Sequence, residues 1–251
     1  MIPVRIFGIA CSPRHGNTEI LVKEALNAAK EIPGVETEFY SIAGKKMSPC
    51  NSCYRCMNAP KENPCPAHKD DFKDVYPRFF AADGLLVGVP VYCQDVTAQF
   101  AAIRDRLVMV SEFSQLGVFG LRNKPIGAIT VAWDRNAGQE SVIYSIHRFA
   151  LICDMLPVSV GPERSPKFGI GAYSGCAGAQ FYHPFAPTPE MTGAGKVNSR
   201  AEREVVMKDK AGMNAARMIG FRVAELSKVI KAGFNTVPKD EQKWGRGPIK
   251  E

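Results

Sequence analysis

Four cysteines lie in one short stretch of the chain, and closely spaced thiolates are ligands for metal ions and iron–sulfur clusters. Cys50, Cys53 and Cys56 form a C-x-x-C-x-x-C run, and Cys65 follows after eight intervening residues. Three thiolates at this spacing can converge on one side of a wrapping loop, as in the compact run of bacterial ferredoxins. A fourth thiolate from a flexible loop would complete the ligand shell. The stretch therefore predicts a metal or iron–sulfur centre.

Two other interpretations fit the same residues. A zinc site with four cysteines has the same ligand count, and the run could also hold free thiols or a disulfide. In a reducing cytosol such crowding favours metal or redox chemistry over disulfides. The scattered cysteines are expected to be small buried hydrophobes; they are Cys11, Cys93, Cys153 and Cys176.

A second group of polar residues stands between an apolar segment and a helical pattern. It contains Ser12, Arg14, Gly16, Asn17 and Thr18. Side-chain donors, the N–H groups of a helix start and the helix dipole together make a site for a terminal phosphate. Gly16 allows a backbone conformation that a Cβ would penalise. An ordinary helix cap by Asn17 or Thr18 would use the same residue types.

Apolar segments alternate with helical patterns along the chain. Strands are predicted at 4–10, 35–42, 84–92, 125–133 and 156–161, and helices at 18–31, 70–81, 97–110 and 139–155. Such alternation predicts a parallel sheet covered on both faces. The α/β fold class expected is a doubly wound five-stranded parallel sheet, with the ligand site beyond the carboxyl ends of the strands.

Three segments resemble the flavin loops of the NADPH-dependent FMN reductase family. The first is Ser12-Pro-Arg-x-Gly-Asn-Thr-Glu19, which resembles the FMN-phosphate loop. The second is Gly88-Val-Pro-Val-Tyr92, with Ala98 and Asp105-Arg106 downstream. The third is Ala137-Gly-Gln-Glu140, with His147 one helix further on. The resemblance covers roughly residues 4–161 and implies a flavodoxin-like fold that binds FMN.

The resemblance also implies which residues contact the flavin. The Tyr92 ring can lie against the isoalloxazine, although it could instead be a rim aromatic. Glu140 could also simply begin its helix. The family commonly has Lys where Ala101 stands. The implied FMN-binding residues are Ser12, Arg14, Gly16, Asn17, Thr18, Pro90, Val91, Tyr92, Cys93, Gln94, Gly138, Gln139 and Glu140.

The cysteine run resembles the iron–sulfur flavoprotein branch of this family. That resemblance implies a [4Fe–4S] cluster on Cys50, Cys53, Cys56 and Cys65, although the spacing before Cys65 is slightly longer than in that branch. It further implies electron transfer between cluster and FMN, with ferredoxin, NAD(P)H or a small acceptor as redox partner, in a homodimer or homotetramer. The alternatives are an NAD(P)H-dependent FMN or quinone reductase without a functional cluster, and a non-enzymatic, zinc-containing redox-sensing module.

Residues 1–198 are expected to form the FMN-binding domain, including a cluster loop at 47–69 and a long loop at 162–198. Residues 199–251 are expected to form a helix over 199–234 and a tail that together serve oligomerisation. This helix is expected to pack between subunits, although it could instead cover the sheet of its own chain. Five apolar residues could supply the contacts: Val205, Met213, Ala216, Ile219 and Val223.

The net charge is +7, and +4 of it falls in 199–234, where eight Lys and Arg accompany four Asp and Glu. Without interleaved aromatics this pattern indicates a solvated helix face, so no nucleic-acid partner is expected. No apolar run reaches the ~20 residues of a membrane span. The amino terminus lacks a signal-peptide pattern. A cytoplasmic location is therefore expected.

Overall fold

A parallel β-sheet forms the centre of the computed structural model, which describes residues 3–114, 120–132, 137–159, 176–180, 205–238 and 241–242. Four strands lie in the order β2-β1-β3-β4, and a fifth position follows beside β4. Their bounds are β1 (Val4–Ala10), β2 (Val35–Ser41), β3 (Gly84–Pro90) and β4 (Pro125–Ala132). All pairs are parallel, so the predicted doubly wound fold is confirmed.

Two short segments share the fifth position. β5 (Leu156–Pro157) pairs with the start of β4, and β6 (Cys176–Gln180) pairs with β4 residues 128–132. Because β3 occupies the other edge of β4 over 126–131, both segments lie on the same edge. The strand predicted at 156–161 is therefore shorter than expected. The segment predicted as a loop at 162–198 contributes a strand, and its other residues lie outside the described part.

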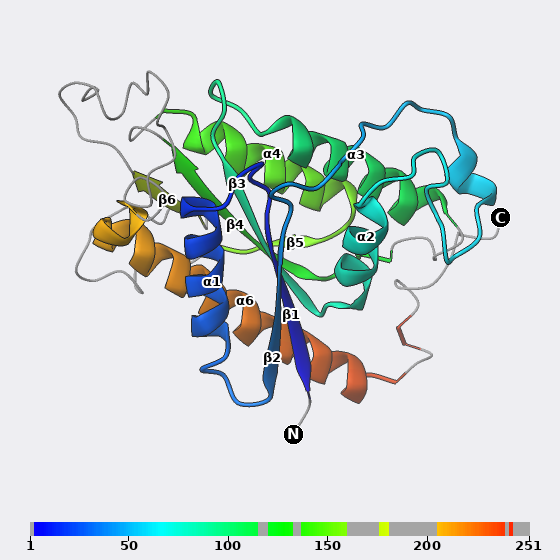
Figure 1. Ribbon diagram of the computed structural model, residues 1–251. Helices are drawn as coiled ribbons and strands as arrows, with labels where there is room; N and C mark the ends of the chain where they lie inside the picture. Colours follow the sequence, from blue (N-terminus) through cyan, green and yellow to red (C-terminus); the bar gives the residue numbers. More distant parts are fainter. Residues whose placement is uncertain are drawn as a thin grey trace, which may run out of the picture.

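Helices cover both faces of the sheet, as Figure 1 shows. α1 (Asn17–Ala29) and α6 (Lys210–Thr236) cover one face; α2 (Phe72–Ala81), α3 (Ala98–Phe113) and α4 (Gln139–Ile152) cover the other. Side chains of β1 alternate between the two cores: Phe7 packs with α2, α3 and α4, and Ile6 packs with α1 and α6. None of the described helices is long and apolar enough to cross a membrane.

The carboxyl-terminal helix differs from the predicted one in where it begins and in what it packs against. It begins at Lys210, after the 3₁₀ turn η2 (Val205–Lys208), and not at residue 199. Ala216, Ile219 and Val223 are fully buried against α1 and the sheet of the same chain, and Met213 packs at the edge of that core. The structure thus shows the alternative, in which the helix covers the sheet of its own chain, and the prediction that Ala216, Ile219 and Val223 lie between subunits is wrong. The side chain of Val205 lies outside the described part. An amphipathic pattern shows that a face is buried, but it does not identify the surface that buries it.

Glycines allow α1 and α6 to approach the sheet and each other. A Cβ at Gly220 of α6 would lie 1.9 Å from the carbonyl oxygen of Ala25 in α1. On the sheet, a Cβ at any of four strand positions would lie 2.2 to 2.7 Å from a side chain of α1 or α6; these positions are Gly8, Gly84, Gly88 and Gly127. Small residues on this face therefore set the distance between the layers.

Replacing Gly220 tests this close approach. We expect Gly220→Ala to lower the free energy of unfolding by about 1–3 kcal/mol, because the new methyl group overpacks the contact with α1. Gly233→Ala in the same helix is the matched control, since its Cβ would meet nothing within 4 Å. Because Ala has a higher helix propensity than Gly, Gly233→Ala should instead raise the free energy of unfolding by up to ~1 kcal/mol. Urea denaturation measures both, and equal stabilities would contradict the proposed packing.

Candidate functional site

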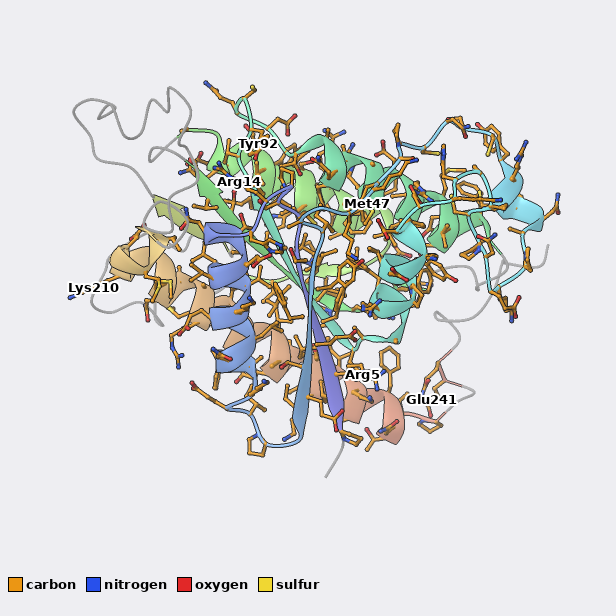
Figure 2. The ribbon with its side chains drawn as sticks, in the orientation of Figure 1. Arg5, Arg14, Met47, Tyr92, Lys210 and Glu241 are labelled. Atoms are coloured by element: carbon orange, nitrogen blue, oxygen red, sulfur yellow. The ribbon has the colours of Figure 1, made fainter. Side chains whose placement is uncertain are left out.

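Two loops at the carboxyl end of the sheet are tied together by a buried threonine. Thr97 caps the start of α3 by accepting from the N–H of Phe100 at 3.2 Å. Its hydroxyl also donates to the carbonyl oxygen of Cys11 at 2.9 Å. Figure 2 shows Arg14 and Tyr92 at this end of the sheet, away from Arg5. The loops after β1 and β3 therefore meet where a doubly wound sheet binds its ligand.

The loop after β1 leads into an uncapped helix start. The Ser12 hydroxyl donates to the carbonyl oxygen of Arg14 at 2.7 Å and so holds the turn. Gly16, with φ 147°, precedes α1, and no side chain caps the helix. The Asn17 side chain instead accepts from the N–H of Val206 at 3.1 Å. The alternative of an ordinary cap by Asn17 or Thr18 is thus not observed, and the helix start suits an anion.

The loop after β3 makes a tight two-residue turn. Tyr92 and Asp95 exchange backbone hydrogen bonds of 2.8 and 3.0 Å. Between them Cys93 and Gln94 have φ values of 48° and 64°, the left-handed conformation of a type I′ turn. The turn directs its residues outward, so Cys93 is exposed and the expectation that it is buried is wrong. Cys11 is buried as expected, and Tyr92 is 40% exposed.

The segment before α4 touches this turn. Gly138 has φ 102°, and a Cβ there would lie 2.6 Å from the Cα of Gln94. The side chain of Gln139 is buried and accepts from the N–H of Ala137 at 2.7 Å. Glu140 is exposed in the first turn of α4. The second and third predicted flavin loops are therefore in direct backbone contact.

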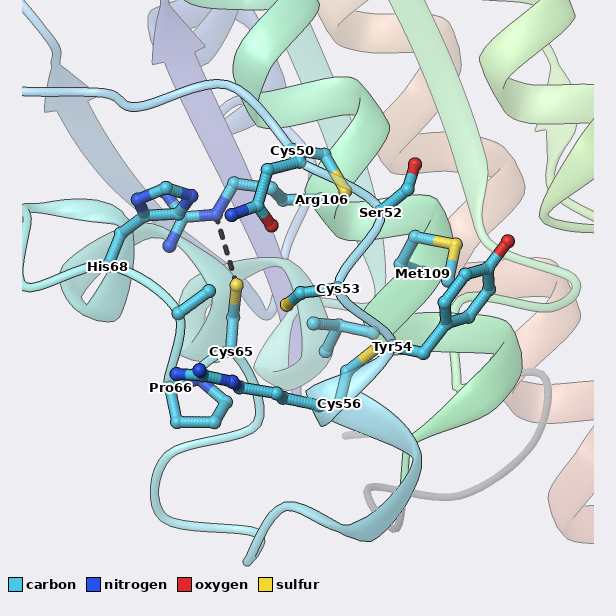
Figure 3. Close-up of a pocket in the computed structure, with 14 residues that line it drawn as sticks. Cys50, Ser52, Cys53, Tyr54, Cys56, Cys65, Pro66, His68, Arg106 and Met109 are labelled. Carbon is cyan, nitrogen blue, oxygen red and sulfur yellow. Dashed lines mark hydrogen bonds between the residues drawn. The ribbon is translucent and has the colours of Figure 1, made fainter.

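The cysteine segment folds around a pocket beside α3. Ser52 and Tyr54 both have positive φ, so the chain reverses on either side of Cys53 before the 3₁₀ turn η1 (Arg55–Asn58). The pocket has a volume of about 360 Å³, including space open to solvent. Figure 3 shows its lining, which includes all four predicted ligands: Cys50, Cys53, Cys56 and Cys65.

The thiols are close enough to influence one another. Burial raises the pKa of Cys56, and the neighbouring Cys65, Cys50 and Cys53 raise it further. All four thiols are free. Within the described ranges, no group of three or more His, Cys, Asp or Glu side chains is arranged to hold a single metal ion.

A zinc ion and a four-iron cluster require different distances between their thiolate ligands. A zinc ion bound at about 2.3 Å by four thiolates would bring the sulfurs to roughly 3.8 Å from one another. In a four-iron cluster each thiolate binds its own iron, so the sulfurs stand further apart. Four thiols that line one pocket are a ligand set that either kind of centre could use.

A buried arginine from α3 reaches a cysteine of this pocket. Arg106 is 2% exposed, and its Nε donates to the Sγ of Cys65 at 3.2 Å (Figure 3). Its Nη1 donates to Asp70 at 2.7 Å and to the carbonyl oxygen of Ser48 at 3.2 Å. Sequence reasoning placed Arg106 only in the second flavin motif. Its contact with the cysteine segment, 41 residues away in the chain, has no sequence signal.

Two polar side chains follow Cys65 closely in the chain: Asp70, which binds Arg106, and His68, which lines the pocket. Burial would raise the pKa of Asp70, but hydrogen bonds from Arg106 and the N–H of Ser48 outweigh it and hold the pKa below its usual value. His68 also lines the pocket, and its buried Nε2 has no hydrogen-bond partner within the part of the chain described. An occupant of the pocket that can hydrogen-bond to this ring nitrogen would satisfy it.

Helix α3 extends from the predicted flavin loops to the cysteine pocket. Thr97, at its start, binds the first flavin loop, whereas Arg106, Met109 and Val110 further along line the cysteine pocket. At 1.5 Å per residue, Ala98 and Arg106 are about 12 Å apart along the axis. The two predicted sites are thus adjacent but separate in one chain.

The chain is similar in sequence to a family of known proteins. Residues 4–161 match a family described as NADPH-dependent FMN reductase. An iron–sulfur flavoprotein of Methanocaldococcus jannaschii is 37% identical over 229 residues, which cover 91% of this chain and 100% of that protein. An iron–sulfur flavoprotein of Methanosarcina thermophila is 37% identical over 156 residues, covering 62% of this chain and 77% of that protein.

Solved structures share the fold at low sequence identity. A WrbA-like flavodoxin of Agrobacterium tumefaciens superposes with a TM-score of 0.53 at 16% identity, covering 90% of this chain and 98% of that one. RosB, solved with a bound 8-demethyl-8-formylriboflavin-5′-phosphate, superposes with a TM-score of 0.58 at 13% identity, covering 99% and 100%. These likenesses concern the fold alone.

Replacing Gly138 tests the contact between the second and third loops. We expect Gly138→Ala to weaken FMN binding and to lower the free energy of unfolding by about 1–3 kcal/mol more than its control, because the methyl group displaces Gln94. The control is Gly44→Ala, which also has positive φ but open space around it. FMN titration and urea denaturation of both variants measure the difference. Equal effects in the two would mean that only backbone strain matters.

Proposed function

The chain belongs to the NADPH-dependent FMN reductase family, in its iron–sulfur flavoprotein branch, and we propose that it transfers electrons between a [4Fe–4S] cluster and FMN and onward to a redox partner. It is a flavin-dependent oxidoreductase with FMN as the flavin of its family. The observation that carries the proposal is the single pocket lined by four free thiols, joined through α3 to the flavin loops.

At the flavin, the chain supplies binding and orientation. The uncapped start of α1, with Ser12, Arg14, Asn17 and Thr18 around it, would hold the terminal phosphate. Pro90 to Gln94 and Gly138 to Glu140 would lie along the ring, with Tyr92 exposed enough to contact it. FMN supplies two-electron chemistry and can also release electrons singly, so the residues need only position it.

At the cysteine segment, Cys50, Cys53, Cys56 and Cys65 would ligate the cluster, which supplies one-electron transfer. The residues fit this group because the four thiols line one pocket and because the ring of His68, whose buried Nε2 has no partner among the described residues, lines it too. Met109 and Val110 of α3 line the same pocket and help to exclude water from it.

The redox partner would approach a basic rim. The cysteine segment and its flanks in the sequence carry five exposed positive side chains, whereas Glu62 is the exposed acidic one between 43 and 71. The positive residues are Lys45, Lys46, Arg55, Lys61 and Lys69. Such a rim steers anionic partners, which favours ferredoxin or NAD(P)H over a neutral acceptor. A homodimer or homotetramer belongs to the proposal, supported by the exposed Tyr144, Leu151 and Ile152 of α4.

Comparing two flavins tests the phosphate loop. We expect apoprotein to bind FMN at least roughly tenfold more tightly than riboflavin, because hydrogen bonds to a charged group contribute about 1.5–3 kcal/mol. Ser12→Ala should weaken FMN while leaving riboflavin unchanged, since Ser12 holds only the phosphate turn. Calorimetric titration measures the four affinities. Comparable affinities of the native protein for the two flavins would refute the phosphate assignment.

Metal analysis tests the cluster itself. Anaerobically purified protein should contain about four irons and four sulfides per chain. Cys53→Ala should lose most of that iron and keep FMN, because the flavin loops lie elsewhere in the chain. Cys93→Ala is the control and should keep the iron, since Cys93 stands in the turn after β3. Protein with one zinc and no iron after anaerobic reconstitution would instead indicate a flavin reductase with a structural metal.

A further inference from the structure

The Nε–H···Sγ hydrogen bond from Arg106 to Cys65 joins a buried cation to one predicted cluster ligand. We propose that Arg106 is a positioning residue that raises the reduction potential of the cluster through this bond. The inference rests on the proposed function, because it requires a cluster bound by Cys65. Arg106 would then act on the cluster as well as belonging to the second flavin motif of the sequence.

The guanidinium is fixed in place by contacts that leave its Nε directed at the sulfur. Its Nη1 is used by the Asp70 carboxylate, itself 1% exposed, and by the carbonyl oxygen of Ser48. The guanidinium also lies over the ring of Phe72, with Cζ 4.0 Å from the ring centroid. A planar guanidinium held by these partners cannot rotate without breaking one of them. The donor to Cys65 is therefore preorganised.

Reduction of a thiolate-bound cluster adds one electron to a group that already carries negative charge. A donor to a ligand sulfur stabilises the more negative state, so hydrogen bonds to the sulfurs raise the potential. The effect is strengthened because Arg106 is buried, where electrostatic interactions are screened less than in water. Asp70 offsets the full charge of Arg106, so the local Nε–H donor has the larger influence on Cys65.

A conservative replacement separates this role from the ion pair. Arg106→Lys keeps a cation for Asp70 but lacks the fixed Nε–H fork. Arg104→Lys is the matched control on the same helix, since Arg104 pairs with Asp105 and Ser145 and does not line the pocket. Redox titration of anaerobic holoprotein, followed by electron paramagnetic resonance, measures the cluster potential. The flavin potential and the iron content are measured on the same samples.

We expect Arg106→Lys to make one-electron reduction of the cluster at least tenfold less favourable, a fall of 59 mV, with iron content and flavin potential unchanged. Arg104→Lys should leave all three unchanged. An unchanged cluster potential in iron-loaded Arg106→Lys protein would overturn the inference. Native protein without iron would refute the proposed function instead, and the metal analysis shows that before any potential is measured.

If Arg106→Lys protein does not retain its cluster, the double variant Arg106→Gln with Asp70→Asn replaces the buried ion pair by a neutral amide pair. Such replacement avoids leaving Asp70 as an unpaired buried charge. The same fall in cluster potential is expected there. A cluster potential equal to that of the native protein in the double variant would overturn the inference.

Discussion

The ion pair between Arg106 and Asp70 lies where the two ends of the cysteine loop meet. Both side chains are almost fully buried, and a buried charge is tolerated only when it is paired and hydrogen-bonded. Asp70 meets this condition by accepting from Arg106 and from the N–H of Ser48, both at 2.7 Å. Beside it, the N–H of Lys46 donates to Asp71 at 2.7 Å, and the N–H of Asp71 donates back to the carbonyl oxygen of Lys46 at 3.1 Å. Residues 46–48 and 70–71 are thereby held together, and the four cysteines lie on the loop between them.

This closure also fixes the loop relative to the flavin site, because Arg106 belongs to α3. The start of that helix is held by Thr97, whose hydroxyl binds the loop after β1. A change in the position of α3 would therefore move both the cysteine pocket and the flavin loops. The fold uses one helix, already needed to cover the sheet, to keep the two predicted redox sites in a fixed relation.

The sequence was sufficient to predict the central strands of the sheet. Central strands buried on both faces are continuous apolar runs. The ends of β1, β3 and β4 were therefore predicted to within two residues of those observed. β6 was missed because Cys176–Gln180 consists mainly of small residues without β-branched or aromatic side chains. The four cysteines were predicted to act together from their spacing alone, and they share one pocket. Arg106 could not be assigned to that pocket, because its partners Ser48, Cys65 and Asp70 are 36 to 58 residues away in the chain.

Backbone strain in the cysteine segment connects its conformation to ligand binding. Ser52 and Tyr54 adopt left-handed conformations without being glycine, which costs about 1–3 kcal/mol at each position. Such strain persists only where surrounding contacts determine the conformation. Cys53, between them, is exposed and lines the pocket with the other three cysteines. In a bound state the ligand bonds of Cys50, Cys53 and Cys56 would supply such contacts, because the free energy of metal binding offsets the cost of ordering the loop. In the proposed function, cluster binding would thus offset the strain at Ser52 and Tyr54. The Arg106–Asp70 pair holds the two ends of the loop together without a cluster.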